Sequence, residues 1–490
     1  MGDDFYTVLG VPKTASSEQI KRAYLELAVK YHPDTNPEKK NTEIFLVIQH
    51  AYDVLSNPVK RKEYDESVKA INPQVSPIEL NWLFSRSEIP KLNEPQSVYA
   101  KLDIKYIQTK EEYSTPPNHL CIVLDRSTSM KGERLDSVRE NLRQFISALR
   151  SIDLVSIVVF NDKAEILIAP TTNGNKQILF EKIDSINASG GTEIFRGLKA
   201  GIDLLWQGNL KTHLPNLLLL TDGHTYGDEE NCIELVNRAV EKNIKINALG
   251  FGNEWNDKFL DEITGITGGC AYYVKTLFDL PKFLQITLTS LSTTVAHNTN
   301  LEIQKNDDVQ LKYIFRIEPE ISQLQLKDPV QMGNLIKEKK SSYFFAFELS
   351  SSVKKLTEID LITGKVRFVL SDIHNRYAEQ DIAIRLKVSD KPSEISIPLE
   401  IVQAMARVNL FLMQEKSKQD VDNGNVNNAV RRLTYLATHL IGQGNVPFAK
   451  EVLNEAESIK KGQAYSEDGI KRLKYGTRAL LQLPEPEKRK

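Results

Sequence analysis

The chain has 490 residues, which at roughly 150 residues per domain corresponds to about three domains. Apolar residues make up 41% of it and charged residues 26%, with 24 Gly and 20 Pro, which excludes a collagen-like, mucin-like or largely disordered chain. The 63 basic and 65 acidic residues give a formal net charge of −2. The chain as a whole therefore lacks the basic field on which nonspecific nucleic-acid binding depends.

The cysteines and the hydropathy of the sequence indicate in which cellular compartment the protein is expected. Cys121, Cys232 and Cys270 are scattered without CxxC spacing, so neither a disulfide framework nor a cysteine zinc site is supported. The acidic N-terminus MGDDFYTVLG lacks the basic and apolar regions of an export signal, and no run of 18 apolar residues occurs. We therefore expect a soluble, cytoplasmic protein without a membrane span.

The first predicted elements are two amphipathic helices. Apolar side chains recur at helical spacing from Ile20 to Tyr31 and again from Phe45 to Leu55. The connecting segment contains Pro33 and Pro37, which cannot continue a helix. Ser16 or Ser17 is expected to cap the first of these helices.

After a linker, the hydropathy pattern changes from that of helices alone to that of alternating strands and helices. A stretch punctuated by prolines, from about Ala70 to Pro95, is predicted to lead into a strand near 99–106. From 120 to about 280, apolar runs alternate with helical segments, which is typical of a parallel sheet covered by helices on both faces. This part is predicted to be a doubly wound α/β domain.

Short alternating strands follow the α/β region. Tyr343–Phe347 and Val366–Leu370 are two of them, with no helical segment between the strands from about 290 to 400. This pattern predicts an antiparallel β-sandwich. The strand near 99–106 could complete it, with the α/β domain inserted in the sequence between them.

The C-terminal part is predicted to be helical. Gly424–Val426 and Gly444–Val446 are similar and lie 20 residues apart, which we interpret as successive antiparallel helices that begin alike. The predicted fold is therefore multidomain, and its parts are an N-terminal all-α domain (1–70), a linker with strands (71–116), an α/β domain (117–290), a β-sandwich (291–400), a helical region (401–483) and a disordered tail (484–490).

Three N-terminal segments carry a specific resemblance. Asp4–Val11, the run Ile20–Asp34 and the run Ala51–Asp65 match in order and spacing the J domain of DnaJ-type co-chaperones. The resemblance covers nearly all of residues 1–66. It implies that the His-Pro-Asp loop docks on a DnaK-type heat-shock chaperone and stimulates its ATP hydrolysis.

The resemblance also assigns residues. His32, Pro33 and Asp34 are the stimulating residues, and the basic contacts to an acidic chaperone surface are Lys21, Arg22 and Lys30. Leu25-Glu26 stands where the family often has a basic pair, so we expect a different chaperone affinity or partner choice. Because the Gly/Phe-rich linker and the CxxC pairs of other J proteins are missing, the rest of the chain must select the client.

A second group of polar residues follows predicted strands of the α/β domain. Asp125, Ser127 and Ser129 come directly after one strand, Asp222 ends another, and Thr192 precedes a helix. Ligands of parallel sheets bind outside the carboxyl ends of the strands, so these oxygens are expected to meet there. An all-oxygen set of this kind suits Mg²⁺ or Mn²⁺.

With Asp153–Phe160 and Thr267–Tyr273, this set resembles the von Willebrand factor A (VWA) domain and its metal-ion-dependent adhesion site, over about 160 residues. The resemblance implies that the metal keeps a place for an acidic side chain of a partner protein. Asp125, Ser127 and Ser129 would be direct ligands, Thr192 direct or through water, and Asp222 water-mediated or outside the first ligands. Thr128 in place of a frequent glycine, and the nearby cation of Arg126, are expected to lower metal affinity.

No enzyme motif accompanies these groups. A Walker loop, a GxSxG elbow and an HExxH helix are all missing, so we expect no enzymatic activity. His224 is expected to be an exposed loop residue, and Cys121 and Cys270 to fill core positions. The sequence favours a co-chaperone adaptor that binds a DnaK-type chaperone and an acidic protein partner; the alternatives are a metal-dependent scaffold with a docking J domain, and a metal-dependent hydrolase, for which no nucleophile or base is visible.

Overall fold

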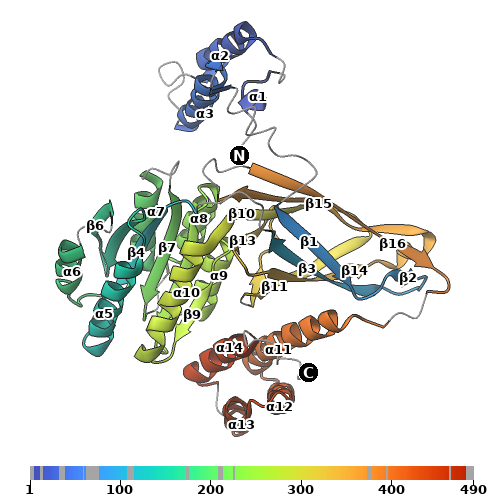
Figure 1. The fold of residues 1–490 in the computed structure, drawn as a ribbon. Helices are drawn as coiled ribbons and strands as arrows, with labels where there is room; N and C mark the ends of the chain where they lie inside the picture. Colours follow the sequence, from blue (N-terminus) through green and yellow to red (C-terminus); the bar gives the residue numbers. More distant parts are fainter. Residues whose placement is uncertain are drawn as a thin grey trace. The chain divides into compact units, whose positions relative to one another are not determined.

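The computed structural model (Figure 1) describes most of the chain, namely residues 5–11, 15–31, 39–58, 60–61, 77–107, 115–172, 176–207, 213–223, 227–319, 321–371, 377–392, 396–462 and 465–481. The chain divides into two compact units. The smaller comprises residues 1–76 together with 374–378, and the larger comprises the remainder.

The smaller unit is helical, as predicted. It contains α1 (Phe5–Val8), α2 (Ser17–Tyr31) and α3 (Lys39–Leu55). Ser16 caps α2: its Oγ accepts from the Gln19 N–H at 3.2 Å, and Gln19 Oε1 accepts from the Ser16 N–H at 2.8 Å. The side chains buried between the elements are Tyr6, Leu9, Ala15, Ile20, Ile48, Ala51 and Leu55.

The α/β domain of the larger unit is built on a six-stranded sheet with the order β6-β5-β4-β7-β8-β9. All neighbours are parallel except β5 and β6. The strands are β4 (Asn118–Asp125), β5 (Leu154–Phe160), β6 (Ala164–Thr172), β7 (Leu214–Thr221), β8 (Lys245–Phe251) and β9 (Ala271–Val274). The predicted parallel sheet is therefore confirmed, with β6 as its antiparallel edge.

Helices cover both faces of this sheet (Figure 1). On one face lie α5 (Glu133–Ala148), α6 (Lys176–Asp184) and α10 (Leu280–Thr293). On the other lie α7 (Ile194–Gln207), α8 (Glu229–Glu241) and α9 (Asp257–Ile266). Because β4, β5 and β7 are buried on both sides, they are almost continuously apolar, as doubly covered parallel strands are.

Two five-stranded sheets make up the β-sandwich. Their orders are β1-β3-β14-β11-β12 and β13-β10-β15-β16-β2, and β2 pairs parallel to β16. The strands are β1 (Ile78–Phe84), β2 (Glu88–Pro90), β3 (Gln96–Tyr106), β10 (Thr294–Ile303), β11 (Val309–Glu318), β12 (Ser322–Leu324), β13 (Val330–Ile336), β14 (Ser341–Leu349), β15 (Glu358–Leu370) and β16 (Tyr377–Ser389).

The α/β domain interrupts the sandwich in sequence. Strand β3 precedes it and pairs with β14, which follows it, with Val98 opposite Phe347 and Ile104 opposite Ser341. The interpretation of Ala70–Pro95 as a linker is wrong for 78–90, where β1 and β2 lie. Pro77 precedes β1, Pro90 ends β2 and Pro95 precedes β3, so these three prolines fall at strand ends, where the ladder loses no donor.

Four helices follow the sandwich: α11 (Leu399–Asp422), α12 (Val426–Gly442), α13 (Val446–Lys460) and α14 (Glu467–Leu481). As the repeat predicts, α12 and α13 begin alike, each after a glycine with φ near +74° or +81°, the left-handed region in which glycine is unstrained. Helix α11 covers the outer face of the first sheet, where Phe315 meets Phe411 at 5.5 Å between ring centroids, and α12 and α14 pack on α11. Among the described helices, none is long and apolar enough to cross a bilayer.

Candidate functional site

Two carboxylates meet at the carboxyl ends of neighbouring strands. Asp125 is the last residue of β4, and Asp222 directly follows β7, which is hydrogen-bonded to β4 with Leu124 opposite Leu220. Both side chains are completely buried. The parallel topology therefore brings these two residues to one edge of the sheet, as expected from the sequence.

Hydroxyl groups link the two carboxylates. Asp125 Oδ1 accepts from the Ser127 N–H at 2.8 Å, and Asp125 Oδ2 accepts from the Thr221 hydroxyl at 2.6 Å. The Ser127 and Ser129 hydroxyl oxygens are 2.9 Å apart, and Ser129 donates to Asp222 Oδ1 at 2.7 Å. The loop after β4 thus forms a continuous run of oxygen contacts between the two aspartates.

Thr192 approaches from a separate loop. Its Oγ1 lies 3.0 Å from the position that a β-carbon on Gly223 would occupy, immediately beside Asp222. Thr128 holds this loop in place, because its N–H and its hydroxyl both donate to the Gly190 carbonyl at 3.0 Å. The structure therefore links Asp125, Ser127, Ser129 and Asp222 through hydrogen bonds and places Thr192 against Gly223 beside them. Thr128 joins the loop after β4 to the loop that carries Thr192.

The cation at this cluster is Arg134 of α5. Its Nη1 lies 2.5 Å from Asp222 Oδ2, and its side chain is 39% exposed. Arg126, whose cation is predicted to lie near the metal, pairs with Glu165 of β6 at 3.1 Å. Arg134 lies in the first turn of α5 between Glu133 and Asp136, so no local pattern in the sequence marks it as the partner of Asp222.

The electrostatics of the cluster fit a bound cation. Burial raises the pKa of the Asp125 carboxyl to about 6, although hydrogen bonds from Thr221 and Ser127 oppose the rise; the neighbouring Asp222 adds to it. Among the described residues, no group of three or more His, Cys, Asp or Glu side chains could hold a metal ion. A metal here would therefore depend on the hydroxyls as well as on the two carboxylates, a hard oxygen set that suits Mg²⁺.

The predicted chaperone-binding residues lie on and after α2. His32, Pro33 and Asp34 fall outside the described residues, as does the Lys30 side chain. Lys21 and Arg22 are exposed on α2, and Arg22 Nε lies 3.1 Å from Glu26 Oε1. Glu26, which stands where the family often has a basic residue, therefore pairs its carboxylate with Arg22, one of the predicted chaperone contacts.

The predictions for Cys121, Cys270 and His224 have different outcomes. Cys121 is buried as predicted, and burial raises the pKa of its thiol to about 12. The prediction that Cys270 fills a core position is wrong: it is partly exposed, and its Sγ lies 2.7 Å from Arg316 Nη2. Cys270 follows the glycines before β9 and so stands just outside the buried strand. His224 lies outside the described residues.

Three family models match the chain. They are the DnaJ domain over residues 4–65, the von Willebrand factor type A domain over 119–286, and the Sll0103-like, C-terminal alpha-helical domain over 399–483. The chain joins a J domain to a VWA domain. A J domain implies interaction with a DnaK-type chaperone, a VWA domain implies protein binding, and both are typically non-catalytic.

Known proteins resemble separate parts of this J–VWA chain. The protein sll0103 of Synechocystis sp. is 28% identical over 229 residues, which are 45% of this chain and 54% of that protein. The chaperone protein DnaJ 1 of Mycobacterium leprae is 58% identical over 64 residues, 13% of this chain and 16% of that protein. The chain thus spans about half, or less, of the length of these relatives.

A solved structure shares the fold of most of the chain. The von Willebrand factor type A protein from Catenulispora acidiphila superposes with a TM-score of 0.64 at 15% identity, covering 83% of this chain and 98% of that one. At this identity the likeness concerns the fold alone.

Proposed function

We propose that this protein is a co-chaperone adaptor. Its J domain recruits a DnaK-type chaperone and stimulates ATP hydrolysis, while its VWA domain holds a protein partner through Mg²⁺ or Mn²⁺. The observation that carries the proposal is the pair of buried carboxylates, Asp125 and Asp222, bridged by hydroxyls in a chain that also carries a J domain. The adaptor brings the partner to the chaperone.

The residues of the VWA domain have distinct roles in this proposal. Asp125, Ser127 and Ser129 would hold the metal directly, Thr192 directly or through water, and Asp222 through water or by fixing Ser129. The bound metal would supply a positive charge for a carboxylate of the partner. The surrounding residues position these oxygens: Thr221 fixes Asp125, and Thr128 fixes the loop that carries Thr192.

On the J domain, His32, Pro33 and Asp34 would stimulate the chaperone, with Lys21, Arg22 and Lys30 meeting its acidic surface. Because both sides of that contact are charged, its association rate should fall as salt rises. The Arg22–Glu26 pair on exposed α2 reduces the positive charge available there.

Single-turnover ATP hydrolysis by a DnaK-type chaperone tests the J-domain half. Wild-type protein should stimulate hydrolysis, His32→Gln should not, and Asp125→Ala should stimulate as wild type does. Capture of a partner on immobilised protein tests the other half, and should be lost in EDTA and in Asp125→Ala. Partner capture that survives both would remove the metal from the proposal.

A scaffold is the second candidate function, in which the J domain serves only as a docking module. The Arg22–Glu26 pair favours this candidate, because it weakens the basic contact through which a stimulating J domain would bind the chaperone. Asp34→Asn separates the two: cellular activity should be lost if the protein is an adaptor that stimulates the chaperone, and retained if it is a scaffold.

A further inference from the structure

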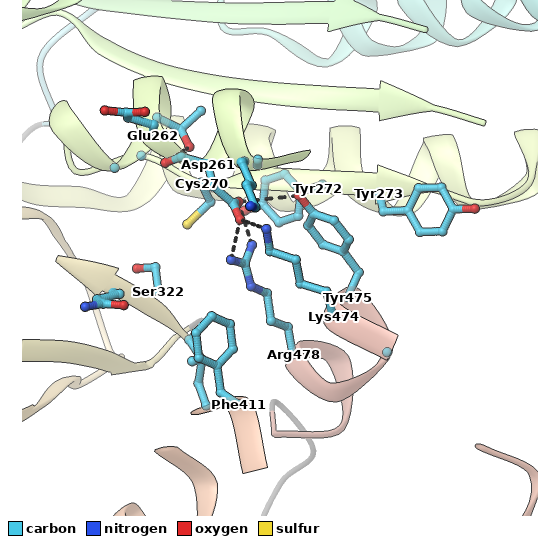
Figure 2. A pocket seen from close by; sticks show the side chains of 18 of the residues that line it. Asp261, Glu262, Cys270, Tyr272, Tyr273, Ser322, Phe411, Lys474, Tyr475 and Arg478 are labelled. Carbon is cyan, nitrogen blue, oxygen red and sulfur yellow. Dashed lines mark hydrogen bonds and ion pairs between the residues drawn. The ribbon is translucent and has the colours of Figure 1, made fainter. Parts of the chain in front are cut away.

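A cavity of about 840 Å³ lies in the larger unit, away from the oxygen cluster (Figure 2). Helix α9 and strand β9 of the VWA domain form one side, and the chain from Ile321 to Lys327, which includes β12, forms another. Helices α11, α13 and α14 complete it. Three parts of the fold thus converge on one space that the adaptor mechanism does not use.

The edges of two sheets border this cavity. Within the described strands, β9 pairs with β8 alone and β12 with β11 alone. Tyr272 packs on Phe283 of α10, whereas Tyr273 packs on Trp255 at the opposite face of the sheet, yet both tyrosines line the cavity. Because successive side chains of a strand point to opposite faces, the cavity must run along the edge of β9.

The Ile321–Lys327 segment offers the longer edge. All seven of its residues line the cavity, although only Ser322–Leu324 pair with β11. At about 3.3 Å per residue this is a border of roughly 20 Å, the length of an ordinary strand. The hydroxyl of Ser322 is buried without a hydrogen-bond partner in the described part of the chain. An edge of this kind is a template for another extended chain.

The cavity also has apolar walls. Phe411 of α11 and Phe448 of α13 contribute rings, and Leu326, which is 46% exposed, lies at the border segment. Such side chains would receive the apolar residues on one face of an added strand. A purely polar small molecule would leave them in contact with water.

An ion cluster makes the floor rigid. Arg478 donates through both terminal nitrogens to Asp261 at 2.8 and 2.7 Å, and Lys474 Nζ lies 2.6 Å from Asp261 (Figure 2). Lys474 Nζ is also 2.6 Å from Asp257. Burial alone would raise the pKa of Asp261, but Arg478 and Lys474 outweigh it and lower that pKa to about 2. These contacts fix α14 on α9, so the cavity has a defined shape.

The charge of the lining favours an acidic occupant. Lys474 and Arg478 of the lining are paired with Asp261, and the rest of the lining holds five basic and four acidic residues. The exposed charged residues of the lining are four cations, Lys258, Lys275, Lys282 and Lys327, and two carboxylates, Glu262 and Glu451. Lys275 lies 4.0 Å from Glu451, and the four lysines against two exposed glutamates leave an excess of two positive charges at the rim.

We propose that this cavity binds an extended, acidic and apolar segment of a partner polypeptide, which adds as a strand along Ile321–Lys327. Its backbone bonds to that edge, its apolar side chains fill the space between Phe411 and Phe448, and its carboxylates face the rim lysines. This site goes beyond the proposed adaptor function and needs no metal. It would hold partners that the oxygen cluster does not.

Fluorescence anisotropy with the full chain, in EDTA, tests the proposal. The probe is a labelled peptide of about seven residues that alternates leucine and glutamate. Two matched peptides separate the contribution of charge from that of backbone hydrogen bonds. One carries lysine in place of glutamate, and the other is N-methylated at alternate residues, so that one edge of the extended peptide cannot donate. Each should bind at least about tenfold more weakly than the first, which corresponds to about 1.4 kcal/mol.

A protein variant locates the site. Leu326→Glu changes an exposed side chain at the border and should weaken the acidic peptide about tenfold, while Leu399→Glu, at a 67% exposed position outside the cavity, should not. Phe448→Ala, which removes a ring from the cavity wall, should also weaken binding of the acidic peptide. Equal binding of the N-methylated or the lysine peptide, unchanged binding by Leu326→Glu, or binding that requires Mg²⁺ would each overturn the proposal. Loss of metal-dependent capture in Asp125→Ala would leave it untouched.

Discussion

Arg134→Gln should tighten Mg²⁺ or Mn²⁺ binding by the VWA domain. The guanidinium lies 2.5 Å from Asp222, where it neutralises a carboxylate that a metal would also need. A partly exposed pair of this kind contributes about 1 kcal/mol after solvent screening. A divalent ion must also approach against the positive charge of Arg134. Removing that charge should therefore improve metal affinity about tenfold, equivalent to about 1.4 kcal/mol.

Isothermal titration of the purified chain with Mn²⁺ measures this effect directly. Arg134→Lys keeps the charge and should stay close to wild type, and Arg143→Gln, on the same helix but paired with Asp184, controls for lost charge on α5. Without metal, Arg134→Gln should melt at a lower temperature because buried Asp222 loses its ionic partner. Unchanged or weaker Mn²⁺ binding by Arg134→Gln would refute the reasoning and assign Arg134 a supporting role in the site.

Three further predictions concern other parts of the chain. Glu26→Lys removes the carboxylate from Arg22 and should strengthen chaperone binding a few-fold at low salt; no gain at low salt would count against the charge argument. Asp261→Asn should cost about 3 kcal/mol at neutral pH in urea unfolding followed by tryptophan fluorescence, because Arg478 loses its partner. Since the pKa of Asp261 lies below its ordinary value, its contribution to the free energy of unfolding is present above about pH 4 and is lost as the pH falls toward 2. A wild-type protein that is no more sensitive to acid than the variant would contradict this prediction. Gly197→Val should destabilise the VWA domain by about 2 kcal/mol in the same unfolding assay, because a β-carbon there would lie 2.5 Å from Phe160; an unchanged midpoint would show that the ring can move.

The VWA sheet and its oxygen cluster could be predicted because both follow from short, continuous stretches of the sequence. Buried parallel strands are apolar runs, and Asp125 and Asp222 each stand where such a run ends. Strand β1 was missed because its neighbouring prolines resemble a linker. Only a fold shows whether such prolines stand at a strand end or in a loop.

Contacts between distant elements could not be predicted. Arg134 bonds to a residue 88 positions away, and Arg478 to one 217 positions away, so no local pattern links them. Each of these residues, taken alone, is an ordinary basic residue on a helix. The cavity was equally hidden, because it lies where three separately folded parts meet rather than within one motif.

The insertion of the VWA domain in the sandwich has a consequence for synthesis on the ribosome. Asp103 of β3 meets Ser342 of β14 across 239 residues of sequence. At about 5–20 residues per second, β3 is made roughly 10–50 s before its central partner exists. During that interval an unfinished sheet presents an open edge, while the helical J domain, made earlier, can already fold. We expect nascent chains arrested before β14 to retain a DnaK-type chaperone more strongly than chains arrested after it, so this protein would be a client of the system that we propose it recruits.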